Sequence, residues 1–161
     1  MSISVGLVSL GCSKNQIDAE IMLASLEDSG IEIKDDAAMA DVAIVNTCGF
    51  IESAKKESIE EVLELAKLKE EGKIKKIVVT GCLAERYKDE IHKELPEVDA
   101  VFGIGANSDM PALIGGLFES EYSSSFPDKE KLEICGRRIM LNPSYFAYIK
   151  IAEGCSNRCT Y

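Results

Sequence analysis

Short apolar runs rich in β-branched residues alternate along this chain with longer amphipathic segments, and this alternation restricts the fold more than any other feature. The runs are expected strands at residues 3–10, 41–46, 74–80 and 98–103, with a further short one near 31–34. Helical spacing of apolar residues predicts helices at residues 13–29, 53–70, 84–93 and 107–113. Strands that alternate with helices form βαβ units, which predicts an α/β fold with a mostly parallel sheet and helices on both faces.

The 161 residues are sufficient for one such domain, of Rossmann-like or flavodoxin-like type, and a short further segment. We assign residues 1–119 to the domain. Residues 120–144 are expected to be a linker, because they begin with a polar stretch that contains three consecutive serines and Pro127. Residues 145–161 are expected to begin a second domain with one more strand, at residues 145–151.

The charge of the chain is strongly negative and unevenly distributed. The formal net charge is −10; residues 137–161 carry +3, so residues 1–136 carry −13. Phosphate contacts require Lys and Arg, and we therefore do not expect this domain to bind nucleic acid by itself. A basic partner, such as a basic protein, suits it better. The acidity is equally consistent with a role in solubility alone.

The cysteine content and the absence of targeting signals indicate a reduced compartment. No apolar run approaches the roughly 18 residues that a membrane span requires. The first residues lack a basic region and a cleavage site of small residues, which predicts a cytoplasmic protein. Thiols stay reduced there, so the six cysteines indicate metal binding or redox chemistry rather than structural disulfides.

Three of the cysteines occupy equivalent places, each just past the end of an expected strand. They are Cys12, Cys48 and Cys82, and each has a glycine beside it. Their spacings of 36 and 34 residues match successive βα units. The carboxyl ends of parallel strands share one edge of a sheet, where open α/β folds bind ligands. We therefore expect the three thiols to converge.

Several chemistries remain open for such a trio. Three thiolates can bind three irons of a [4Fe–4S] cluster and leave the fourth iron open. They could instead bind zinc with an open position, act as a redox sensor, or be small buried hydrophobes. Helix N-termini beside the thiols are expected to lower the thiol pKa and favour thiolate. Polar side chains near the same edge are candidates for hydrogen bonding there, or for simple capping and turn formation: Asn15, Asn46, Thr47 and Arg86.

The end of the chain carries a second motif, Cys155-x-x-x-Cys159-x-Tyr161. This spacing alone is weak, and two thiolates are expected to retain a four-iron cluster poorly. Cys135 has no partner motif and is interpreted as structural. His92 lies in a polar helix end and is expected to be a surface residue rather than a ligand.

The cysteine set resembles the radical-SAM methylthiotransferases over essentially the whole chain. Three stretches carry the resemblance: residues 10–20 (LGCSKNQIDAE), 46–59 (NTCGFIESAKKESI) and 79–87 (VTGCLAERY). Their amino-acid sequences are most similar to the branch that modifies an aspartate of a small-subunit ribosomal protein. A branch that modifies adenosine in tRNA is the alternative within the family.

The resemblance implies two [4Fe–4S] clusters and S-adenosylmethionine. It assigns Cys12, Cys48 and Cys82 to an auxiliary cluster. It assigns Cys155 and Cys159 to the cluster that binds S-adenosylmethionine, with Tyr161 near the adenine. It also implies a basic ribosomal protein as substrate and an electron donor such as flavodoxin or ferredoxin, with no role for a membrane. Because the third cysteine of the second motif and the domains after it are missing, we expect the chain alone to be inactive.

Overall fold

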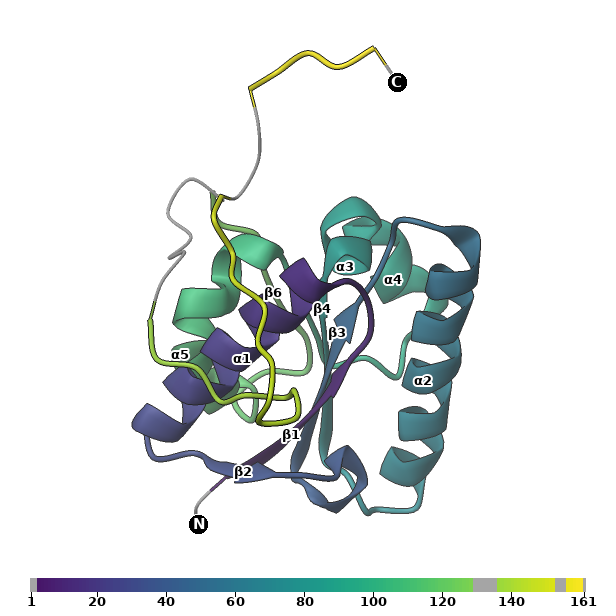
Figure 1. Ribbon diagram of the computed structural model, residues 1–161. Helices are drawn as coiled ribbons and strands as arrows, with labels where there is room; N and C mark the ends of the chain where they lie inside the picture. The colour runs from purple at the N-terminus through teal and green to yellow at the C-terminus, as the bar shows by residue number, and fades with distance from the viewer. Residues whose placement is uncertain (1–2, 129–135, 153–155, 161) are drawn as a thin grey trace.

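The computed structural model describes residues 3–128, 136–152 and 156–160, and these form a six-stranded sheet (Figure 1). Its strands lie in the order β2-β1-β3-β4-β5-β6, and every neighbouring pair is parallel. The strands are β1 (Ser4–Ser9), β2 (Glu32–Lys34), β3 (Val42–Thr47), β4 (Lys76–Gly81), β5 (Ala100–Phe102) and β6 (Ser123–Ser125). The predicted α/β class and parallel sheet are confirmed.

Helices cover both faces of this sheet, as the alternation predicted (Figure 1). They are α1 (Ser13–Asp28), α2 (Glu52–Glu70), α3 (Cys82–Arg86), α4 (Lys88–Glu94) and α5 (Met110–Gly116), with 3-10 turns at Ala37–Met39 and Ile104–Asp109. Met22 of α1 and Met110 of α5 join a core cluster with Phe102. Val62 of α2 and Ile91 of α4 join a second cluster on the other face. Strands buried on both faces explain why the sequence reads as continuous apolar runs.

The register of the three central strands places their carboxyl ends level with one another. Asn46 of β3 lies opposite Ser9 of β1 on one side and Thr80 of β4 on the other. Thr47 lies opposite Gly81. The residues that follow β1, β3 and β4 therefore leave the sheet side by side at one edge.

Two parts of the structure differ from the sequence-based expectation after residue 119. Ser123–Ser125, expected within a linker, pairs with β5 as the edge strand β6. Serine has no strong strand preference, so the free edge of β5 decides its conformation. The strand expected at residues 145–151 is not confirmed, because residues 143–152 form no strand and lie along α1 instead. Lys150 in this segment pairs with Asp18 of α1.

Smaller differences concern helix boundaries. The single helix expected at residues 84–93 is divided into α3 and α4 at Tyr87, whose backbone leaves helical geometry with φ −124°. The last helix begins at Met110 rather than near residue 107, because Ile104–Asp109 forms a 3-10 turn first. No helix in the described residues combines the length and apolar character needed to cross a bilayer.

Asp41 ties the starts of three strands together, which makes the stability of the fold depend on pH. Its carboxylate accepts hydrogen bonds from the amide (3.0 Å) and hydroxyl (2.7 Å) of Ser4, and Lys75 Nζ lies 2.7 Å away. The Lys75 ammonium and the Ser4 hydrogen bonds lower the pKa of Asp41 from 3.8 to about 2.

We expect Asp41→Asn to lower the free energy of unfolding by about 1–2 kcal/mol at pH 7. Because the folded-state pKa is depressed, this stability is complete above pH 4 and is lost as the pH falls towards 2. The difference between the wild type and the variant in urea denaturation should therefore shrink below pH 4. Asp35→Asn, at an exposed carboxylate near the same edge, is the control. A difference that is constant from pH 7 to pH 3 would contradict the assignment.

Candidate metal centre

Cys12 lies at the start of α1, directly after the turn that leaves β1. It is the N-cap residue, with extended backbone (φ −86°, ψ 169°), and its carbonyl accepts the first helical hydrogen bond from Gln16 (3.0 Å). Its side chain makes no capping hydrogen bond and is exposed. The N-cap is therefore Cys12 and not the polar Ser13 or Asn15 that follow it. The thiol of Cys12 is left available as a ligand.

Cys48 follows β3 and is half-buried. Its backbone is held by Ser58 of α2, whose hydroxyl accepts from the Cys48 amide (3.3 Å) and donates to its carbonyl (3.5 Å). The turn after β1 lies against it, because a Cβ added to Gly11 would lie 3.2 Å from Cβ of Cys48. Gly11 has φ +133°, which disfavours any side chain at this position. The first two cysteine-bearing turns are therefore in close contact.

Cys82 is the first residue of α3, and it too is half-buried. The turn after β3 packs onto it, because a Cβ added to Gly49 would lie 3.1 Å from the Cys82 carbonyl oxygen. Arg86 Nη1 donates to the Gly49 carbonyl (3.0 Å), which joins the same two turns from the next turn of the helix. The structure thus brings together the three turns that carry Cys12, Cys48 and Cys82, as predicted.

The polar residues singled out at this edge form the network that holds the turns together. Asn15 is buried, and its Nδ2 donates to the carbonyls of Thr47 (2.9 Å) and Leu10 (3.2 Å). Asn46 Nδ2 donates to the Asn15 carbonyl (2.9 Å), and Thr47 Oγ1 donates to the Thr80 carbonyl (2.5 Å). These side chains bind backbone rather than ligand, so their effect on the site is to fix its shape.

The electrostatics of the thiols differ from the expectation in one respect. Burial raises the pKa of Cys82 above its ordinary value, and negative charge on Cys12 and Cys48 raises it further, with Lys14 opposing. The predicted lowering by helix N-termini is therefore wrong for Cys82, because loss of solvent outweighs the short helix α3. The mutual effect of the three thiols is itself a sign of their proximity.

The donor set of this edge is chemically suited to an iron–sulfur cluster. In the described part of the chain, no three His, Cys, Asp or Glu side chains are gathered closely enough around one point to hold a metal ion. In a four-iron cluster each thiolate binds a different iron, so its three protein ligands need not meet at one point. Three soft sulfur donors on adjoining turns match that donor set. Binding would drive the thiols to thiolates whatever their pKa in the free chain.

Of the other candidates, Cys159 and His92 lie within the described residues. Cys159 is exposed in the chain's last described stretch, whereas Cys135, Cys155 and Tyr161 lie outside the described residues. His92 is exposed and stacks on Tyr122 at 3.8 Å between ring centroids, in line with a surface role.

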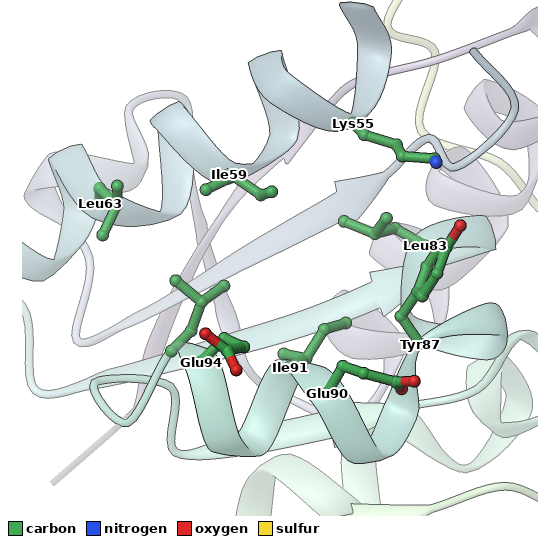
Figure 2. A pocket seen from close by; sticks show the side chains of 9 residues that line it. Lys55, Ile59, Leu63, Leu83, Tyr87, Glu90, Ile91 and Glu94 are labelled. Atoms are coloured by element: carbon green, nitrogen blue, oxygen red, sulfur yellow. The ribbon is translucent and has the colours of Figure 1, made fainter. Parts of the chain in front are cut away.

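A pocket of about 530 Å³ opens between α2 and the α3–α4 pair (Figure 2). Figure 2 shows Ile59 and Leu63 projecting from α2 towards Leu83 and Ile91 on the opposite side. Its walls are mainly aliphatic, and it carries no cysteine. It reaches the candidate metal centre only through Leu83, the neighbour of Cys82, so it adds no ligand to that centre.

Comparison with known proteins shows that the part of the chain that forms this edge matches a protein family. The model described as "Uncharacterized protein family UPF0004" matches residues 4–103, a span that contains β1 to β5 and all three converging cysteines. The chain belongs to this family. Its UPF0004 part therefore coincides with the sheet and the candidate metal centre.

Curated relatives extend the similarity to nearly the whole chain. Proteins named ribosomal protein uS12 methylthiotransferase RimO are 49% identical in Caldicellulosiruptor saccharolyticus, 48% in Clostridioides difficile and 47% in Desulforamulus reducens. The alignments cover 99%, 99% and 98% of this chain. The chain spans only 37%, 36% and 36% of the length of these relatives. The resemblance to methylthiotransferases is confirmed.

Proposed function

We propose that this chain is the N-terminal auxiliary-cluster domain of an enzyme that methylthiolates an aspartate β-carbon in ribosomal protein uS12. The observation that carries the proposal is the convergence of Cys12, Cys48 and Cys82 at one sheet edge, in a chain about half identical to proteins named for that activity. A buried hydrogen-bond network that fixes this edge supports a preorganised ligand set.

The three thiols are the ligands of a [4Fe–4S] cluster in this proposal. With three protein ligands, such a cluster supplies one iron free to hold a sulfur-containing ligand for transfer. Cys12 contributes the exposed thiol, on the side open to a reaction partner, and Cys48 and Cys82 contribute half-buried ones. Asn15 and Arg86 hold the turns in register, and burial around Cys82 limits access of water.

The remaining parts of the proposal concern the rest of the protein. Cys155 and Cys159 are the first two ligands of a second [4Fe–4S] cluster that binds S-adenosylmethionine, and Tyr161 lies near its adenine. Reduction of that cluster requires an electron donor such as flavodoxin or ferredoxin. The acidic charge of residues 1–136 suits a basic ribosomal protein as substrate, and we place the reaction in the cytoplasm.

A strain that lacks the whole gene tests the function. We expect mass spectrometry to show that uS12 from this strain lacks the added methylthio group. Complementation with the full-length gene should restore the group. Methylthiolated adenosine in tRNA should be unchanged in the same strain. Loss of the tRNA modification with normal uS12 would instead establish the tRNA branch, and loss of neither would overturn both assignments.

A further inference from the structure

The pocket between α2 and the α3–α4 pair presents apolar side chains to solvent (Figure 2). We call it the α2–α4 groove. Its floor belongs to the core, since Leu83 and Ile91 are each only 5% exposed. Its α2 wall is different, because Ile59 and Leu63, one helical turn apart, are 40% and 41% exposed. Exposed apolar side chains that border an open groove are typical of a site where another chain binds.

The charges on the α2 wall of the groove cancel one another within the helix. Lys55 Nζ lies 2.9 Å from a carboxylate oxygen of Glu52, and Lys56 Nζ lies 3.6 Å from one of Glu60. Lys55 also lies over the ring of Tyr87, 5.1 Å from its centroid. These lysines are therefore already engaged, and this wall offers little net charge to a partner.

The α4 wall of the groove carries negative charge that is not balanced in the same way. Glu90 and Glu94 line the groove one helical turn apart, and both are exposed (Figure 2). Neither carboxylate forms an ion pair within the part of the chain that the structure describes. The lysines of α4, Lys88 and Lys93, line a separate pocket with Tyr122. The groove thus combines apolar walls with two available carboxylates.

We infer that the α2–α4 groove is the docking site for a basic, amphipathic segment of the protein substrate. The inference rests on the proposed function, in which that substrate is a basic ribosomal protein. Apolar side chains of the segment pack against Ile59 and Leu63, and its Lys or Arg side chains pair with Glu90 and Glu94. The charge argues against a second copy of this chain as the occupant, because residues 1–136 carry −13.

The position of the groove connects docking with the chemistry. Leu83 of its floor directly follows Cys82, and Lys55 lies in the first turn of α2, the helix after the turn that carries Cys48. The α2 wall runs from Lys55 to Leu63, which is about 12 Å of helix. About four extended residues or two helical turns fill that length. A segment bound here ends beside the candidate metal centre, where the residue to be modified must be held.

The first test measures binding of purified uS12 to the full-length protein that contains this chain. We expect Glu90→Gln combined with Glu94→Gln to raise the Kd about threefold or more at about 0.1 M salt, because two ion pairs are lost. The affinity of this variant should also depend less on salt than that of the wild type. Glu57→Gln combined with Glu64→Gln is the matched control, since it makes the same charge change at exposed positions of α2 that do not line the groove.

The second test addresses the apolar wall. Leu63→Gln should raise the Kd about fivefold, because it removes an apolar contact without disturbing the core. Met39→Gln, at a side chain that is 73% exposed and does not line the groove, should bind uS12 like the wild type. The photo-crosslinking residue p-benzoylphenylalanine in place of Leu63 should join to uS12 on irradiation, and in place of Met39 it should not.

Wild-type affinity for uS12 in either groove variant would overturn the inference, and so would a wild type that does not bind uS12. A crosslink from position 63 only to the same chain or to a second copy would overturn it as well. All substituted side chains are exposed, so circular dichroism should show that every variant is folded. Failure of the docking site is distinct from failure of the proposed function, because the deletion strain reports on modification of uS12 without any change to the groove.

Discussion

Replacement of Cys48 by alanine is expected to abolish stable iron binding by this chain after anaerobic reconstitution. We expect the wild type to take up about four irons and four sulfides per chain and to become coloured. The variant keeps only two thiolates at the sheet edge, and these hold a four-iron cluster poorly. Iron and sulfide analysis with visible absorption should therefore show a loss of most of the bound iron.

Cys159→Ala is the matched control, because its thiol is exposed and belongs to the second motif. Its iron content should equal that of the wild type. Far-ultraviolet circular dichroism should show that both variants are folded. Unchanged iron in Cys48→Ala would refute the ligand assignment. A colourless wild type with a reversible disulfide among Cys12, Cys48 and Cys82 would favour a redox sensor.

Gly81→Ala is expected to cost about 3 kcal/mol or more of the free energy of unfolding, and to impair the metal centre as well. Gly81 has φ +94° and ψ −162°, a region that is nearly closed to residues with a Cβ. An added Cβ would lie 2.5 Å from the Thr47 carbonyl oxygen and 2.6 Å from Asn46 Oδ1. Relief of this clash would separate β4 from β3 where Cys48 and Cys82 leave the sheet.

Gly115→Ala provides the control, because nothing lies within 4 Å of a Cβ at this position of α5. That substitution should be neutral or stabilise the chain by up to about 1 kcal/mol. Urea denaturation at pH 7 measures both variants, and reconstitution with iron measures the centre. Wild-type stability in Gly81→Ala would mean that the close approach of Gly81 to Asn46 and Thr47 of β3 is not needed.

The charge asymmetry of the chain has a structural explanation that composition left open. Residues 1–136 are acidic and residues 137–161 are basic, which suggested a basic partner or a role in solubility. Residues 136–152 answer part of this question within the chain, because Arg137, Arg138 and Lys150 all pair with carboxylates of α1.

Local sequence was sufficient to predict the sheet and the meeting of the three cysteine-bearing turns at one edge. Apolar runs that end in Gly-Cys or Cys-Gly specify strand, turn and ligand within a few residues, and parallel pairing then brings the ends together. Gly11 and Gly81 could be noticed in the sequence, but their close approach to Cys48 and Thr47 depends on turns more than 30 residues apart.

Tertiary structure decided the features that depend on what lies beside a residue rather than on its type. Ser123–Ser125 became a strand because β5 offered a free edge, whereas residues 145–151 lie along α1, where Lys150 pairs with Asp18. Cys82 has a raised pKa because burial outweighs the helix terminus. The sequence by itself determined which residues are candidates for the chemistry. Only packing determined their solvation, their charge partners and the path of residues 136–152, because these depend on groups that are distant along the chain.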